Sequence, residues 1–301
     1  MGKTKSMISN HSSRYGIYQL MAGAAMISFS GVFVKIANVG PTVSAFYRML
    51  FGCLMLMAIV IISRKKIWQG WGAGGLMIIC GFFFAIDLLV WHRSVLYVGP
   101  GLATILTNFQ VFFLAGFGII ILRERLTMRY VLSVPLGLFG LFLIMGGDWS
   151  ALDSDYKLGV LFGLLAAMAY SCYLLTLRKL QSRRDQASTL PTIAMISLST
   201  AVLLAFQMVL EGESFIIPDC KSWISLITYG FLGQVLGWVF ISRGIAKVDA
   251  SRVGLVLLLQ PSLSFIWDII FFQRSAGMIE ILGCILAITA IYMGSAMKKS
   301  N

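Results

Sequence analysis

The stretch VWHRSVLYVGPGLATILTNFQVFFLAGFGIIILRERL, residues 90–126, has a counterpart 150 residues further along the chain. Residues 240–272 read FISRGIAKVDASRVGLVLLLQPSLSFIWDIIFF. In both segments an apolar run ends near an arginine (Arg93, Arg243), a short polar connector follows, and a second apolar run carries a glutamine (Gln110, Gln260). Few residues are identical, so the shared hydropathy pattern is the evidence. It indicates a duplicated chain with both copies embedded in a membrane.

Composition supports the membrane assignment. Of 301 residues, 58% are hydrophobic and 12% are charged, whereas charged residues make up roughly 25% of ordinary soluble domains. A soluble core cannot hide that much apolar surface, and a bilayer requires it. We therefore predict an all-α integral membrane protein.

Ten apolar runs are each long enough to cross a hydrocarbon core of about 30 Å. They cover residues 15–36, 43–62, 71–91, 101–122, 128–145, 158–177, 189–210, 223–241, 253–272 and 277–297. We divide the chain into a cytoplasmic tail (1–14), a first five-helix repeat (15–146), an extracytoplasmic linker (147–157), a second five-helix repeat (158–297) and a cytoplasmic tail (298–301). A cleaved signal peptide is not predicted, because the first run spans a membrane and no clean small-residue site ends it.

Basic residues predict the orientation, because cytoplasmic loops are enriched in lysine and arginine. With both termini inside, 18 of the 24 basic residues fall in inner segments, and acidic residues gather in outer connectors. The net charge of +12 is therefore a topology signal, and nucleic-acid binding is not predicted. An odd number of spans per repeat makes the second repeat enter from the opposite face. Such inverted repeats around a central site are a common plan for secondary transporters.

No cofactor, metal site or enzymatic activity is predicted. The five cysteines are widely separated and form no CxxC spacing, so neither a disulfide framework nor a zinc site is indicated. The two histidines, His11 and His92, lie in the tail and in an outer connector, and the chain has no Walker-type glycine loop. The short connectors leave no room for a soluble catalytic domain.

The ordered motifs resemble the drug/metabolite transporter superfamily, in its ten-helix EamA-like exporter branch. They are Phe29-Ser30-Gly31 in the first span, Pro41 followed by Arg48 in the second, and Leu122-Arg123-Glu124-Arg125-Leu126 after the fourth. The resemblance covers nearly the whole chain. It implies two inverted five-helix repeats around a central cavity, and export of amino acids, related metabolites or drugs across the bacterial inner membrane.

Two positions depart from the family pattern. The family usually has a proline after the polar residue of the fourth and ninth spans. Here Pro261 follows Gln260, but Val111 follows Gln110, so proline chemistry predicts a kink only in the ninth span. The acidic residue expected after the ninth span is replaced by Phe272-Gln273-Arg274. We assign Glu124 alone as a gating candidate, with salt bridges at the inner helix end as the alternative role.

Asp87, Asp268, Lys35 and Arg48 lie inside predicted spans, where a charge costs about 2.5–3.5 kcal/mol on insertion scales. Asp87 and Asp268 each lie four residues before the outer end of a span, and Lys35 and Arg48 lie at comparable depths. Two interpretations stay open. The carboxylates bind and release protons during coupled antiport, or Asp87 forms a static ion pair with Lys35 or Arg48 that makes burial tolerable.

Polar and aromatic residues near the middle of the spans are the candidates for the substrate path. Buried amides are costly without partners, although such residues also join helices to one another in membrane bundles. The candidates are Tyr47, Trp91, Asn108, Gln110, Tyr170, Tyr173, Gln234, Trp238 and Gln260.

We predict a secondary transporter that exports a small metabolite, most plausibly an amino acid or a related amphipathic compound, by alternating access. Its expected partners are a small-molecule substrate and the lipid bilayer, with protons as a candidate coupling ion. An exporter of multiple drugs or organic cations is the alternative within transport, and a membrane scaffold or intramembrane enzyme is the alternative outside it. Spacing alone leaves the direction of transport and the oligomeric state open.

Overall fold

The computed structural model describes residues 2–67, 69–124, 126–145, 154–183, 188–273 and 277–295. Side chains are described throughout these ranges except at residues 2–12, 99–102, 105, 144–145, 154, 268 and 295. Every regular element in the described ranges is helical, in agreement with the predicted all-α class.

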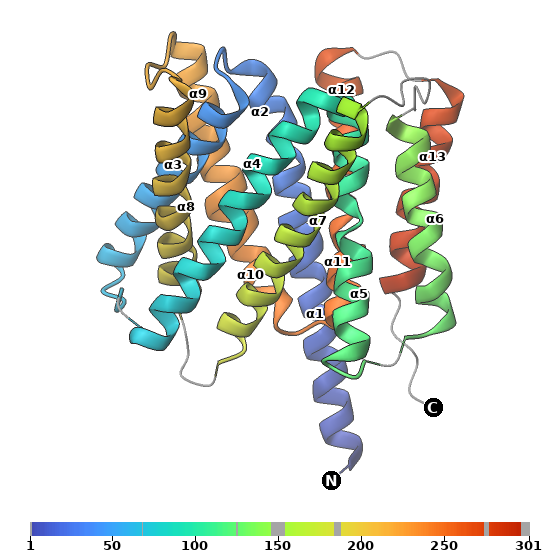
Figure 1. Cartoon of the computed structure of the whole chain (residues 1–301). Coiled ribbons are helices and arrows are strands. Elements are labelled where there is room, and N and C mark those ends of the chain that lie inside the picture. The colour runs from blue at the N-terminus through green and yellow to red at the C-terminus, as the bar shows by residue number, and fades with distance from the viewer. Residues whose placement is uncertain are drawn as a thin grey trace.

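The helices follow one another along the chain with short connectors (Figure 1). The first half contains α1 (Gly2–Ser28), α2 (Ser30–Ile36), α3 (Pro41–Ile62), α4 (Trp71–Asn108), α5 (Gln110–Ile120) and α6 (Met128–Met145). The second half contains α7 (Ser154–Gln181), α8 (Thr189–Glu211), α9 (Cys220–Tyr229), the π-helix η1 (Gly230–Gly237), α10 (Trp238–Ile245), α11 (Ala250–Leu257), α12 (Leu259–Phe272) and α13 (Met278–Ser295).

Length and hydropathy suit these helices to lipid. Seven helical stretches in the described part of the chain are long and apolar enough to cross a membrane, and three shorter apolar helices accompany them. Large apolar side chains such as Ile62, Trp71 and Leu96 are more than 80% exposed. In water this surface would be unfavourable, but hydrocarbon chains can cover it. The arrangement fits a multi-pass membrane protein.

Two segments are more helical than the sequence predicted. Helix α1 begins at Gly2, so the expected N-terminal tail continues the first apolar run as helix. Helix α4 extends over 38 residues and includes residues 92–100, where we expected a connector. These residues contain proline only at position 100, so the backbone before it keeps its helical donors.

Three helical paths are interrupted at a single residue: Phe29 between α1 and α2, Phe109 between α4 and α5, and Leu258 between α11 and α12. At each point there is a hydrogen bond between residues three apart, as in Leu258 N–H to the Leu255 carbonyl at 3.2 Å. Pro261 explains the last interruption, because it has no N–H to donate to the carbonyl four residues earlier. The interruption at Phe109 occurs without a neighbouring proline, which the sequence did not predict.

The main helix pairs each join the first half of the chain to the second. Helix α4 packs along α7, α3 along α8, α6 along α13, α5 along α11, and α1 along α10. The pair α6 and α13 forms one side of the bundle in Figure 1. Small residues let these helices approach closely. A Cβ added at Gly140 of α6 would lie 2.6 Å from the Gly283 carbonyl and the Ala287 nitrogen of α13.

Gly140→Val should therefore separate α6 from α13 and destabilise the fold by about 1–3 kcal/mol, the usual cost of overpacking. Thermal denaturation in detergent would measure the loss. Gly116→Val in α5 is the matched control, because a Cβ at Gly116 meets nothing within 4 Å. Equal melting temperatures for the two variants would show that the close α6–α13 contact contributes nothing to stability.

Candidate functional site

A cavity of about 660 Å³ lies within the bundle. Its walls come from both halves of the chain. This volume is in the range of sites for small organic molecules. The lining residues are Ile27, Ser28, Ser30, Gly31, Lys35, Arg48, Phe84, Asp87, Leu88, Trp91, Thr104, Thr107, Asn108, Gln110, Tyr170, Tyr229, Trp238, Leu257, Gln260, Pro261, Ser264 and Phe265.

The three helix interruptions surround this cavity. Ser28 and Ser30 flank Phe29, Asn108 and Gln110 flank Phe109, and Leu257 precedes Leu258, and all five flanking residues line the cavity. Irregular backbone at membrane depth is tolerated where it is buried in protein or borders a polar cavity. Discontinuous helices of this kind mark substrate sites in other transporter folds.

Arg48 contributes a buried positive charge to the cavity wall. It is the eighth residue of α3, and its side chain is held between two aromatic rings. Its guanidinium carbon lies 5.0 Å from the ring centre of Tyr229 and 5.9 Å from that of Phe84, and its Nη1 donates a hydrogen bond of 3.0 Å to the Tyr229 hydroxyl. Gly233 in η1 lies beside the guanidinium, and a Cβ there would be in ordinary van der Waals contact with Nε at 3.6 Å.

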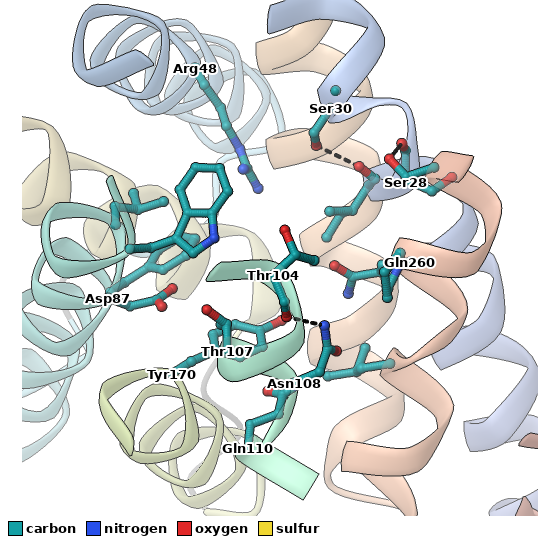
Figure 2. A pocket seen from close by; sticks show the side chains of 18 of the residues that line it. Ser28, Ser30, Arg48, Asp87, Thr104, Thr107, Asn108, Gln110, Tyr170 and Gln260 are labelled. Carbon is teal, nitrogen blue, oxygen red and sulfur yellow. Dashed lines mark hydrogen bonds between the residues drawn. The ribbon is translucent and has the colours of Figure 1, made fainter. Parts of the chain in front are cut away.

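Asp87 contributes a buried negative charge from α4. It is 7% exposed, and its Oδ1 has no hydrogen-bond partner. Within the described side chains, no lysine or arginine nitrogen lies within the 4.0 Å limit of an ion pair with this carboxylate. Figure 2 shows Arg48 and Asp87 reaching toward the same space from separate helices. Lys35 also lines the cavity, with its Nζ 4.7 Å from the ring centre of Phe272. The side chain of Asp268 lies outside the described residues.

Three amide side chains lie on the cavity wall opposite and below these charges (Figure 2). Asn108 donates through Nδ2 to the Thr104 carbonyl at 2.7 Å. Gln110 is 2% exposed, and its Oε1 lacks a hydrogen-bond partner, as does Nε2 of Gln260. Buried amide groups with unused donors and acceptors are suited to binding a polar ligand.

Aromatic side chains form part of the cavity wall and pack on one another. Trp238 packs edge-on against Tyr173 with ring centres 4.8 Å apart, and Tyr173 stacks on Phe84 at 4.3 Å. Tyr170 lies 6.3 Å from Trp238. Trp238 and Tyr173 are fully buried, and we name this group of four rings the aromatic layer.

The structure brings six of the nine predicted path residues to the cavity: Trp91, Asn108, Gln110, Tyr170, Trp238 and Gln260. The other three have structural contacts elsewhere. Gln234 donates to the Ser197 hydroxyl at 2.7 Å, joining η1 to α8. Tyr47 donates to the Phe215 carbonyl. Tyr173 lies within the aromatic layer, behind the lining residues.

Sequence reasoning did not select several polar residues of the cavity. Ser28, Ser30, Thr104, Thr107, Tyr229 and Ser264 all line it. The Phe29-Ser30-Gly31 motif was a signal for the first interruption, but hydroxyl side chains are common in membrane helices because they bond to their own backbone. Thr107, for example, donates to the Ala103 carbonyl at 2.9 Å. Their direction could be known only from the packing.

Glu124 connects the two halves of the chain at the other end of the bundle. Its carboxylate accepts hydrogen bonds from the Ala250 N–H at 2.8 Å, the Ser251 hydroxyl at 2.8 Å and the Ser251 N–H at 3.3 Å. It also lies 3.6 Å from Nη1 of Arg178 in α7. Glu124 thus caps the N-terminus of α11, where a negative charge is favoured, from the connector that follows α5. We name this set of contacts the Glu124 clamp.

A second polar contact joins the halves at the opposite end. The Asp219 carboxylate caps α9 by accepting from the Ser222 N–H at 2.8 Å, and it accepts from the Asn38 amide at 2.9 Å. These donors hold the pKa of the Asp219 carboxyl below its ordinary value, because they stabilise the charged form.

Within the described residues, no group of three or more His, Cys, Asp or Glu side chains could hold a metal ion.

Known proteins resemble the chain over nearly its full length. An uncharacterized transporter of Bacillus subtilis, YcbK, is 24% identical and covers 89% of each chain. The pseudopaline exporter CntI of Pseudomonas aeruginosa is 22% identical and covers 93% of this chain and 96% of its own. A probable amino-acid metabolite efflux pump of Escherichia coli is 22% identical over 64% of this chain and 66% of its own.

A solved crystal structure shares the fold, with a TM-score of 0.78 over 94% of this chain and 97% of its own at 17% sequence identity. The sequence model of the EamA-like transporter family matches the chain twice, over residues 14–146 and 157–295. The two matches together cover most of the sequence, and the relatives are transporters and efflux pumps. The chain therefore belongs to the EamA-like transporter family, and it is a multi-pass membrane transporter and not an enzyme.

Proposed function

We propose that this protein is a secondary transporter that exports a small amphipathic metabolite, an amino acid or a close relative, by alternating access. The observation that carries the proposal is the cavity, which both halves of the chain line with polar and charged side chains, and in which Asp87 Oδ1 and Gln110 Oε1 have no hydrogen-bond partner. The names of the Escherichia coli and Pseudomonas aeruginosa relatives support export of metabolites. Solute movement is driven by the solute gradient or by exchange for protons, with Asp87 and Asp268 as candidate coupling groups.

The architecture we propose has ten membrane spans in two inverted five-helix repeats. Seven long and three shorter apolar helices together supply that number. The packing pattern also supports the inverted repeats. When the two halves are exchanged, α4 corresponds to α10 and α1 corresponds to α7, so the α4–α7 pair corresponds to the α10–α1 pair. Each of the pairs α3–α8, α5–α11 and α6–α13 corresponds to itself. The basic residues favour cytoplasmic termini, and a bacterial inner membrane follows from the family resemblance.

Within alternating access, we infer that the cavity of this state is open to the extracytoplasmic side. The aromatic layer and the Glu124 clamp close the cytoplasmic side. Opening toward the cytoplasm requires α5 to separate from α11, because the clamp and the α5–α11 contact lie between the cavity and that side. Glu124 is then a gating residue.

A second candidate function is the export of organic cations. The buried Asp87 carboxylate, which has no ion-pair partner among the described side chains, supports it. Cationic solutes would bind such a carboxylate directly. The substrate series below separates this candidate from export of amino acids.

Proteoliposomes that contain the purified protein should show saturable flux of a pool of radiolabelled amino acids, well above protein-free liposomes. An imposed pH gradient will accelerate the flux if protons are exchanged and leave it unchanged if the solute gradient alone drives it. Asp87→Asn and Asp268→Asn should abolish the response to the pH gradient if these groups carry the proton. Absence of flux for every amino acid would contradict the proposed substrate class.

Glu124→Gln should weaken the clamp, because hydrogen bonds to a charged group contribute about 1.5–3 kcal/mol. The population open to the cytoplasm should rise about tenfold. A cysteine introduced at Leu114, which is 1% exposed between the cavity and the clamp, reports this change in a background without native cysteines. Its reaction with a thiol reagent in inside-out vesicles should accelerate in the Glu124→Gln variant. The control Glu211→Gln, at the opposite end, should leave the rate unchanged, and equal rates in all three proteins would refute the gating role.

The cavity and the orientation can be tested together by labelling in intact cells. Thr104→Cys lines the cavity, whereas Lys65→Cys lies in the exposed connector between α3 and α4. A reagent that cannot cross membranes should label the first from outside and the second only after permeabilisation. The reverse pattern would place the cavity opening and the termini on the other sides of the membrane.

A further inference from the structure

Two opposite charges line one cavity without forming an ion pair with each other. Arg48 is 6% exposed and Asp87 is 7% exposed. Each has a buried atom without a hydrogen-bond partner, Nε of Arg48 and Oδ1 of Asp87. Burying an unpaired charge is costly, and a static counter-ion pair would have brought the two groups together. Their separation leaves the space between them for a ligand.

The surroundings of Arg48 suit it to an anionic group. Contacts with the Tyr229 and Phe84 rings and the hydrogen bond to the Tyr229 hydroxyl hold the guanidinium plane in place. None of these contacts neutralises its charge. A planar guanidinium presents its donors in a fork that matches a carboxylate.

The surroundings of Asp87 suit it to a cationic group that donates hydrogen bonds. A carboxylate only accepts hydrogen bonds, and the described side chains supply no donor to its Oδ1. Trp91 follows Asp87 by one helical turn and lines the same cavity. Figure 2 shows Thr104 and Gln260 beyond the space between the two charges, where they can contact the remainder of a bound molecule.

A singly charged ligand would leave one of these two groups unsatisfied. An organic cation at Asp87 would leave Arg48 unpaired and would be repelled by it. An organic anion at Arg48 would leave Asp87 unpaired and would be repelled by that carboxylate. A molecule that carries both charges leaves neither group unpaired.

We propose that Arg48 and Asp87 are the specificity-determining residues of this transporter, and that they bind the anionic and the cationic group of one dipolar substrate, so that zwitterions are selected over singly charged analogues. The inference rests on the proposed function. It assigns Arg48 to the carboxylate and Asp87 to the ammonium group of the transported molecule.

Flux measurements with three matched pools test this assignment. The first contains leucine, methionine, phenylalanine and glutamine, the second contains their amides, which lack the carboxylate, and the third contains the corresponding 2-hydroxy acids, which lack the ammonium group. In the wild type, the kcat/KM for the zwitterions should exceed that for either other pool at least tenfold. Arg48→Gln should reduce zwitterion flux at least tenfold and leave amide flux nearly unchanged. Asp87→Asn should reduce zwitterion flux similarly and leave hydroxy-acid flux nearly unchanged.

Matched controls separate recognition from folding. Arg252→Gln and Asp249→Asn alter an ion pair of 3.5 Å outside the cavity. They should not change the flux of one pool relative to the others. If a cavity variant fails to fold, as judged by its melting temperature, the relative flux of the three pools in the wild type still tests whether zwitterions are selected.

Each outcome has a definite meaning. An equal loss of flux for all three pools in a folded Arg48→Gln or Asp87→Asn variant would overturn the roles of Arg48 and Asp87 in substrate recognition. Efficient wild-type flux of amides or hydroxy acids, relative to zwitterions, would overturn dipolar selection while leaving transport intact. Absence of flux for every pool would overturn the proposed function and this inference with it.

Discussion

The hydrocarbon core of a bilayer offers no water to backbone N–H and C=O groups, and this constraint explains most of the structure. Each span is helical because a helix satisfies its own backbone. The exceptions are therefore informative. Interruptions at Phe29, Phe109 and Leu258 occur where the helices border the cavity, which can hold polar ligands or solvent. The same constraint confines Arg48 and Asp87 to the cavity wall.

Close helix packing makes the two halves of the chain interdependent. Gly52 in α3 has no room for a Cβ, because Gln234 in η1 would lie 2.5 Å away. This contact brings the π-helix against α3, the helix that carries Arg48. A charged group of the first half thus lies on a helix that packs closely against the second half. Motion of one half relative to the other would change the environment of both charges in the cavity.

The Glu124 clamp provides a polar counterpart to this apolar packing. A carboxylate from the first half caps α11 and approaches Arg178, both in the second half. Such contacts are directional and can be broken without exposing a large apolar surface, whereas the α6–α13 contact is buried and apolar. Under the proposed mechanism, the clamp breaks during each cycle and the α6–α13 pair remains intact.

The sequence by itself determined the class of the protein, because hydropathy, charge distribution and the repeated pattern around Gln110 and Gln260 are properties of composition and spacing. It also identified most of the polar residues of the cavity, including Arg48, Asp87 and both glutamines. Only the tertiary structure decided which side chains face the cavity. Gln110 and Gln234 are similar amides in equally apolar helices, yet one lines the cavity and the other bonds to Ser197. The direction of a side chain depends on helix rotation and on contacts with the other half of the chain, and a nearly uniform apolar helix leaves no polar face in the sequence to predict it. The interruption at Phe109 has the same origin, since it has no proline and arises where the two halves meet.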